Sequence, residues 1–156
     1  MAERDSPGVR VPPPLIFVAT LGVGAALDHV VFKGMTIAAA PVRYILGALL
    51  AACDVLAIAL ALNLFRRAGT RPEPWQPSSA IVETGVYRYT RNPMYLGMAL
   101  LYVGLALILD SLSSLALLVP LLIVIRYGVI GREEAYLERK FGEPYRLYRR
   151  RVRRWL

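Results

Sequence analysis

Long apolar runs separated by short polar and basic segments dominate this chain. The runs span residues 15–32, 44–65 and 94–125. At 1.5 Å of rise per residue, the second run would form a helix of about 33 Å, enough to cross a hydrocarbon core of roughly 30 Å. The first run shares a basic flank and small residues with cleaved signal peptides, but the apolar run that soon follows favours a transmembrane helix. The pattern therefore predicts an all-α membrane protein.

The run at 94–125 is too long for a single crossing. As one helix it would extend about 48 Å, and its single acidic residue, Asp110, lies at the middle in the sequence DSLSS. We therefore predict a short helical hairpin with helices at about 94–109 and 115–130, the second kinked at Pro120. Together with the two earlier runs, this gives four transmembrane helices.

Basic residues gather on one predicted side of the membrane. The formal net charge is +8, and the tail at 131–156 holds nine basic and four acidic residues, whereas DSLSS has no basic residue. Excess Lys and Arg mark the cytoplasmic side, so a cytoplasmic segment at 1–14, a four-span bundle at 15–130 with a cytoplasmic loop at 66–93, and a cytoplasmic interfacial tail are expected. Charges beside apolar runs favour an anionic bilayer surface over nucleic acid. We expect an integral protein of the bacterial inner membrane with both termini cytoplasmic.

Neither disulfide nor zinc chemistry is indicated. Cys53 is the only cysteine and lies within an apolar run, and His29 is the only histidine. One cysteine cannot form an internal disulfide, and one histidine cannot build a multi-histidine metal site. The mean hydropathy of +0.47 agrees with a membrane protein.

The sequence GVYRYTRNPMYLG at 85–97 stands at the start of the third apolar run. Pro93 favours the first helical position and Asn92 is a candidate N-cap, so a helix is expected to begin at the cytoplasmic surface. Its free backbone N–H groups would attract a carboxylate, and Arg88 and Arg91 would add to that attraction. The alternative interpretation is a basic and aromatic cluster that only anchors the helix at the membrane interface.

The tail GREEAYLERKFGEPYRLYRRRVRRWL continues from the fourth predicted helix. A break is expected at 142–144, followed by a basic amphipathic helix that lies on the membrane. The apolar face of this helix comprises Tyr145, Tyr148, Val152 and Trp155.

Paired acids at Glu133 and Glu134 are unexpected where a transmembrane helix is predicted to end, because that end favours cations. One interpretation pairs them with Arg88, Arg91 or Arg132. In the other interpretation, one of the two glutamates accepts hydrogen bonds from the amine or hydroxyl groups of a ligand.

The two motifs, GVYRYTRNPMYLG and, some forty residues later, EEAYLERKFGEPYRLY, together resemble the isoprenylcysteine carboxyl methyltransferase and phospholipid methyltransferase family. The resemblance covers about residues 79–153. It implies an integral membrane enzyme that uses S-adenosyl-L-methionine, held by the turn before the third span and by the acidic pair.

Carried over by position, the resemblance and the charge of the first motif assign cofactor binding to residues of both motifs and of the segment Ser79 to Val82 just before the first. These are Ile81, Val82, Tyr87, Arg91, Asn92, Pro93, Met94, Tyr95, Glu133 and Glu134. Asn92 stands where many members have histidine. In the prenylcysteine enzymes a substrate arginine lies one turn before the first glutamate, where this chain has Val129. Arg126, one turn further back, and Glu134 are the candidate catalytic residues. The departure at Val129 argues against methylation of a prenylcysteine carboxylate.

The function expected is S-adenosyl-L-methionine-dependent methylation, at O, N or S, of a lipophilic or small apolar acceptor in the bilayer. A helix N-terminus suits the cofactor carboxylate, a glutamate its amine or ribose, and tyrosines its adenine or sulfonium. Two alternatives are an NADPH-dependent membrane reductase of sterol-reductase type and a non-catalytic membrane anchor or assembly protein. The acceptor and the oligomeric state stay open at this point.

Overall fold

The computed structural model describes residues 5–32 and 35–156, and every regular element within these ranges is helical. In chain order the elements are α1 (Pro13–Asp28), α2 (Ala40–Arg67), the 3₁₀ helix η1 (Gly85–Arg88), α3 (Pro93–Ile108), α4 (Leu112–Val124), the π-helical segment η2 (Ile125–Ile130), α5 (Gly131–Phe141) and α6 (Glu143–Arg151). The predicted all-α class is confirmed over this part of the chain.

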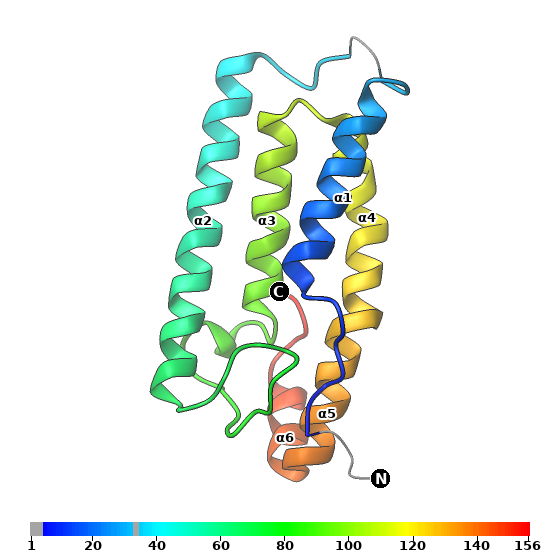
Figure 1. Ribbon diagram of the computed structural model, residues 1–156. Helices are drawn as coiled ribbons and strands as arrows, with labels where there is room; N and C mark the ends of the chain where they lie inside the picture. Colours follow the sequence, from blue (N-terminus) through cyan, green and yellow to red (C-terminus); the bar gives the residue numbers. More distant parts are fainter. Residues whose placement is uncertain (1–4, 33–34) are drawn as a thin grey trace.

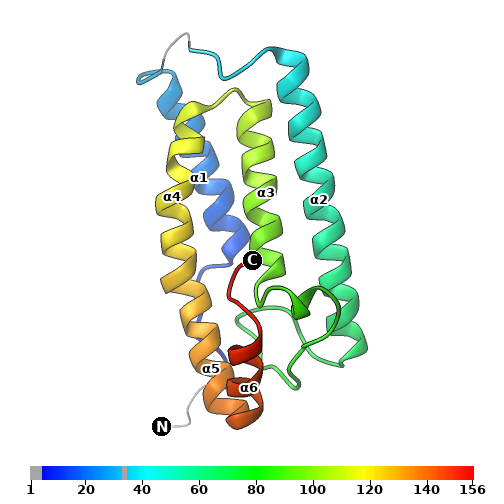
Figure 2. The ribbon, with the colours of Figure 1, turned by 180° about the vertical axis from the view of Figure 1, so that it is seen from behind.

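Helices α1 to α4 run side by side in an elongated bundle, with α3 between α2 and the pair α1 and α4 (Figure 1). The view from behind shows the same arrangement (Figure 2). Helices α2 and α3 approach closely at two glycines: a Cβ added to Gly47 would lie 2.7 Å from the carbonyl oxygen of Gly104, and one added to Gly104 would lie 2.8 Å from that of Gly47. Small residues of this kind are what allow helices to pack closely in a membrane.

Within residues 5–32 and 35–156, two helices are long and apolar enough to cross a membrane, judged by length and composition. They are α2, with 28 residues and a hydropathy of 2.5, and the continuous helix from Leu112 to Phe141, with 30 residues and a hydropathy of 2.1. α1 and α3 are shorter apolar helices. Side chains such as Leu49, Val55 and Leu56 are exposed on α2, as expected for a surface that faces lipid. The number of crossings and the cytoplasmic location of the termini stay predictions.

The predicted hairpin forms between α3 and α4. Asp110 turns the chain with a φ of 57°, and Ser111 caps α4 by accepting a hydrogen bond from the backbone N–H of Ser114. The Asp110 carboxylate also lies 3.3 Å from the Arg43 guanidinium and accepts a hydrogen bond from the backbone N–H of Ile37. The loop before α2 is thereby tied to this turn.

The second helix of the hairpin is longer than predicted. After α4 the chain stays helical through η2 and α5 to Phe141, instead of ending near residue 130. Glu133 and Glu134 therefore lie inside a helix and in the first turn of α5. The expected conflict between the acidic pair and a helix C-terminus does not arise, because the helix continues for about two more turns beyond them.

The tail departs from the prediction of a helix that lies on the membrane. Tyr145, Tyr148 and Val152 pack against Ile81, Leu137 and Phe141, so protein covers the apolar face of α6. The helix ends at Arg151 and the chain is extended at Val152. Trp155 is not on that helical face; it is partly buried against the core of the bundle.

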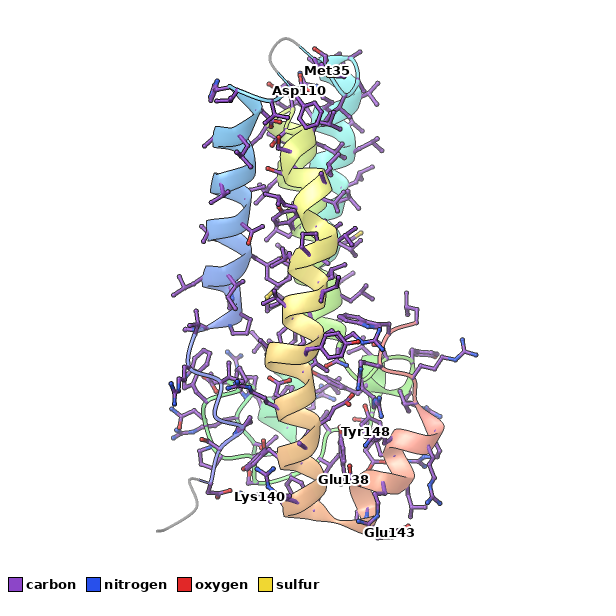
Figure 3. All side chains as sticks on the ribbon, turned by 90° about the vertical axis from the view of Figure 1, so that its right-hand side faces the viewer. Met35, Asp110, Glu138, Lys140, Glu143 and Tyr148 are labelled. Carbon is purple, nitrogen blue, oxygen red and sulfur yellow. The ribbon has the colours of Figure 1, made fainter. Side chains whose placement is uncertain are left out.

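Different segments of the chain gather at the two ends of the bundle. Met35 and Asp110 lie at one end, whereas Lys140 and Glu143 lie at the other (Figure 3). Asp5 of the N-terminal segment is paired with Lys140 at 2.7 Å, so this segment joins α5 and α6 at the second end. The loop after α2 also runs there (Figure 1), and the candidate functional site lies among these segments.

Candidate functional site

A cavity of about 310 Å³ lies at the end of the bundle where the N-terminal segment, the loop after α2, and helices α5 and α6 meet. Sites for small ligands in proteins typically measure about 300–1,000 Å³. Its apolar wall includes Pro13, Pro14, Leu62, Phe65, Met94 and Met98. Its polar and aromatic wall includes Tyr87, Arg91, Asn92, Tyr95, Glu133, Glu134, Tyr136, Tyr145 and Tyr148. A ligand with both apolar and charged parts matches this lining.

The segment before α3 places Tyr87 in the cavity wall. Gly85 starts η1 with a φ of 58°, a conformation that glycine adopts without strain. The Tyr87 ring then packs edge-on against Phe65, with the ring centroids 5.6 Å apart. The Tyr148 hydroxyl donates a hydrogen bond of 2.9 Å to the Tyr87 carbonyl oxygen. Burial raises the pKa of Tyr87, so this residue stays a neutral phenol.

Helix α3 begins at Pro93, as predicted, but Asn92 does not cap it with its side chain. The Asn92 amide instead donates a hydrogen bond of 2.9 Å to the carbonyl oxygen of Arg154. Asn92 was expected to satisfy one of the first backbone N–H groups of the helix, but its side chain makes no such hydrogen bond. Its side chain fixes the chain end to the start of α3.

Tyr95 and Glu133 bring the two sequence motifs together. The Tyr95 hydroxyl, in the first turn of α3, donates a hydrogen bond of 2.5 Å to Oε1 of Glu133 in α5. Burial raises the pKa of Glu133 to about 7, and the nearby Glu134 adds to this rise, whereas the hydrogen bond from Tyr95 opposes it. Within the described ranges no basic side chain forms an ion pair with Glu133, so its charge is not neutralised by the protein.

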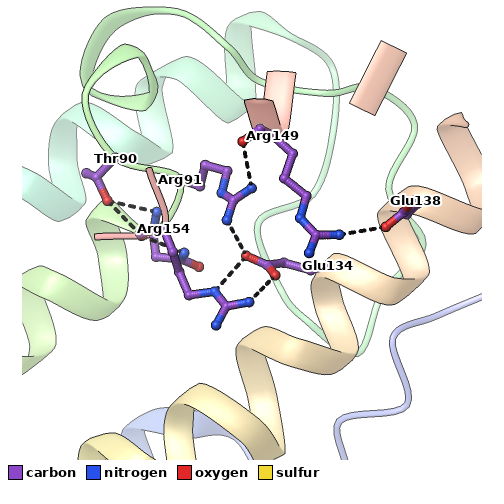
Figure 4. Close-up of polar contacts among 7 residues, drawn as sticks. Thr90, Arg91, Glu134, Glu138, Arg149 and Arg154 are labelled. Carbon is purple, nitrogen blue, oxygen red and sulfur yellow. Dashed lines mark hydrogen bonds and ion pairs between the residues drawn. The ribbon is translucent and has the colours of Figure 1, made fainter. Parts of the chain in front are cut away.

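Glu134 has a different environment from its neighbour. One of its oxygens lies 3.0 Å from the Arg91 guanidinium, and Arg154 donates to both oxygens, at 3.0 and 2.5 Å (Figure 4). The structure therefore realises the predicted pairing with Arg91 for Glu134 alone. Arg132 instead donates to the carbonyl oxygen of Gly8.

The structure gathers most of the predicted cofactor-binding residues around the cavity. Those that line it are Ile81, Val82, Tyr87, Arg91, Asn92, Met94, Tyr95, Glu133 and Glu134. Pro93 is buried at the start of α3 and does not line the cavity. Arg126, a candidate catalytic residue, is exposed, with its guanidinium 5.4 Å from the ring of Tyr127. It does not reach the cavity, because its position on η2 turns it outward.

Sequence reasoning missed several lining residues. Tyr145 and Tyr148 of α6 were assigned to a face on the membrane, because periodicity identifies an apolar face but not what covers it. Tyr136 accepts a hydrogen bond from the backbone N–H of Ser78, which holds the loop after α2 against α5. The ion pair of Arg154 had no signal of its own within a tail rich in arginine.

Two polar groups in the site have unused bonding capacity. The buried Nε of Arg91 finds no partner among residues 5–32 and 35–156. Glu133 is held by one neutral hydroxyl. An unsatisfied buried donor and a carboxylate without a cation are costly unless a ligand engages them. The cavity can therefore bind a ligand that carries both a hydrogen-bond acceptor or anion and a cation or donor.

Within the described residues, the protein is a helical bundle with two helices apolar and long enough to cross a membrane and a ligand-sized cavity at one end. A model of the phospholipid methyltransferase family matches residues 42–144, and the chain belongs to this family. The resemblance seen in the sequence is thereby confirmed, and membership indicates a membrane methyltransferase.

Two relatives match part of the chain. A Protein-S-isoprenylcysteine O-methyltransferase of Schizosaccharomyces pombe is 35% identical over 72 residues, which are 46% of this chain and 30% of that protein. An uncharacterized protein of Haemophilus influenzae is 44% identical over 64 residues, which are 40% of this chain and all of that protein. The match to the S. pombe enzyme thus covers less than a third of its length. No solved structure matches this chain.

Proposed function

We propose that this protein transfers a methyl group from S-adenosyl-L-methionine to a lipophilic acceptor at the cytoplasmic surface of a membrane. The observation that carries the proposal is the hydrogen bond of 2.5 Å between Tyr95 and Glu133, which joins the two family motifs at one cavity. The two residues are 38 positions apart in the sequence, and this contact brings one residue of each motif to the same cavity.

The residues present suit this cofactor. Glu133, which has no basic partner in the part of the chain that the structure describes, would accept hydrogen bonds from the amine or the ribose hydroxyls. The unpaired Nε of Arg91 would donate to the carboxylate. The faces of Tyr87, Tyr145 and Tyr148 would hold the adenine or the positive sulfonium.

The cofactor supplies the chemical activation, since its methyl group is bonded to a positively charged sulfur. The task of the protein is therefore alignment and exclusion of water, and no paired general acid and base is needed. Tyr95 holds the Glu133 carboxylate in a fixed orientation. Arg91 and Arg154 hold the Glu134 carboxylate, so we assign Glu134 to orienting Arg91. Arg126 lies outside the proposed site because it is exposed.

The apolar wall supports a lipophilic acceptor. Leu62, Phe65, Met94 and Met98 line the cavity from the ends of α2 and α3 that lead into the apolar bundle. An apolar molecule dissolved in the bilayer could present its O, N or S atom to the cavity from this side. Family membership favours this function over an NADPH-dependent reductase or a non-catalytic anchor.

The test uses purified protein in nanodiscs. Thermal unfolding is followed with S-adenosylhomocysteine or NADPH, and methyl-labelled cofactor is then incubated with protein and membrane extract to identify the labelled product. We expect stabilisation by S-adenosylhomocysteine alone and a labelled lipophilic product. Glu133→Ala and Tyr95→Ala should abolish both, whereas Glu138→Ala, on the outer surface of the same helix, should not. Stabilisation by NADPH alone, or by neither molecule, would refute the proposal.

A further inference from the structure

The last residues of the chain fold back onto the turn that leads into α3. The backbone N–H of Arg91 donates to the carbonyl oxygen of Arg153 at 3.0 Å. The carbonyl oxygen of Arg154 accepts two further hydrogen bonds, from the Thr90 hydroxyl at 3.1 Å and from the Asn92 amide at 2.9 Å. Three successive residues of the turn are thus tied to two residues at the end of the chain.

The side chain of Arg154 makes a second connection, to α5. Its Nε and Nη2 donate to the two oxygens of Glu134, at 3.0 and 2.5 Å. The guanidinium and the carboxylate are thus joined by two parallel hydrogen bonds (Figure 4). The Glu134 side chain is 8% exposed, and Arg91, also 8% exposed, contacts one of the same oxygens at 3.0 Å. Bidentate pairs of this kind are strong and directional.

Arg154 does not itself line the cavity, whereas Arg91, Asn92 and Glu134 do. We infer that Arg154 is a positioning residue: its guanidinium fixes Glu134, which fixes Arg91, and its carbonyl oxygen fixes Asn92. This inference rests on the proposed function, because it assumes that the cavity wall binds the cofactor.

The consequence is that the cofactor-facing wall assembles only when the end of the chain is folded back. Loss of the Arg154 guanidinium would leave one Glu134 oxygen buried without its donor. The carboxylate could then rotate toward Arg91 and move that guanidinium out of the orientation it has in the cavity wall. Trp155, partly buried against the bundle core, holds the chain end in place beside these contacts.

The first test measures the turn without any ligand. Hydrogen–deuterium exchange of peptides that contain the Arg91 amide is compared between wild type and Arg154→Met in nanodiscs. We expect faster exchange in Arg154→Met, an intermediate rate in Arg154→Lys, which keeps the charge but not the fork of donors, and the wild-type rate in Arg150→Met. Arg150 is the matched control because it is an exposed arginine of α6. Unchanged exchange in Arg154→Met would overturn the inference.

The second test links the turn to the cofactor. Titration calorimetry with S-adenosylhomocysteine should give a dissociation constant about 10- to 100-fold higher in Arg154→Met, the range expected for a charge-assisted hydrogen bond. In a Glu134→Gln background the same substitution should add little, because Arg154 acts through Glu134. Equal losses in both backgrounds would show a general structural effect and contradict the role. If wild type binds no S-adenosylhomocysteine, the proposed function fails, while the exchange rates still decide whether Arg154 orders the turn.

Discussion

Replacing Glu133 with glutamine tests the member of the acidic pair that has no basic partner among residues 5–32 and 35–156. Glutamine keeps the shape, and its amide oxygen can still accept the hydrogen bond from Tyr95, so the substitution removes charge and little else. The matched control is Glu138→Gln, which removes a carboxylate from the surface of the same helix, where Glu138 pairs with Arg149 at 2.8 Å. A difference between the two variants reports on the cavity and not on the loss of a negative charge from α5.

The expected effect follows from the kind of bond that is lost. A hydrogen bond to a charged group contributes about 1.5–3 kcal/mol, and one between neutral groups about 0.5–1.5 kcal/mol. In Glu133→Gln the binding free energy of the cofactor should therefore be about 1–2 kcal/mol less favourable, because its amine meets a neutral acceptor. This is equivalent to about 5- to 30-fold weaker binding. Glu138→Gln should bind as wild type, because an exposed ion pair contributes about 0–1 kcal/mol and lies away from the cavity.

The pH dependence of ligand binding provides a second, independent test of this prediction. Burial raises the pKa of Glu133 to about 7, so its carboxylate is charged above about pH 7 and protonated below it. Affinity for a ligand with a positively charged amine should fall as the pH is lowered from 8 to 6, by up to about tenfold for the unit below the pKa. Glu133→Gln has no proton to gain, so its affinity should change less over this range.

The pH dependence of folding stability should have the opposite sign to that of ligand affinity. A carboxyl whose pKa is higher in the folded state than in the unfolded state favours folding when protonated, and this contribution is lost as the pH rises toward 7. Relative to wild type, Glu133→Gln should therefore be more stable at pH 8 than at pH 6. Titration calorimetry of S-adenosylhomocysteine in nanodiscs at pH 6, 7 and 8, with thermal unfolding of the same samples, measures both effects. Binding by Glu133→Gln within twofold of wild type, with the same pH profile, would refute the reasoning.

Two further predictions concern packing. Gly97→Ala would place its Cβ 2.6 Å from Oδ1 of Asp54 in α2, so it should lower the free energy of unfolding by about 1–3 kcal/mol; Gly22→Ala, where nothing lies within 4 Å, should not, and thermal unfolding compares the two. Tyr148→Phe removes the hydrogen bond to the buried carbonyl of Tyr87. It should lower the free energy of unfolding by about 1–3 kcal/mol. An unchanged melting temperature in Tyr148→Phe would mean that water reaches this carbonyl.

The sequence predicted helix positions where local signals were strong. Pro93 marks the start of α3, and the polar interruption at Asp110 marks the hairpin, because both act through the conformation of their own backbone. Near residue 130 no such signal exists: the apolar run ends, but nothing breaks the helix until Gly142, which adopts a φ of 61°. The change from apolar to polar side chains near residue 130 does not end the helix, whose last residue, Phe141, lies about three turns later.

The tail illustrates a limit of periodicity. Tyr145 and Tyr148 have the spacing of one helical face, and arginines cover the rest of α6, so a membrane surface was a reasonable partner. In the structure that face meets Leu137 and Ile81 instead. An apolar helix face can pack against any apolar surface. Whether lipid, α5 or the loop after α2 covers it depends on tertiary contacts that a local sequence pattern does not contain.

The acidic pair carries this argument into the site. Successive helical residues point about 100° apart, so Glu133 and Glu134 line the same cavity but have different immediate partners. What the sequence could not decide is which glutamate faces which. That assignment depends on Tyr95 reaching α5 from the first turn of α3 and on Arg154 returning from the chain end. Among the residues that the structure describes, two arginines pair with Glu134 and one hydroxyl contacts Glu133. Of the two neighbouring carboxylates, Glu133 is therefore the one available to a cationic ligand.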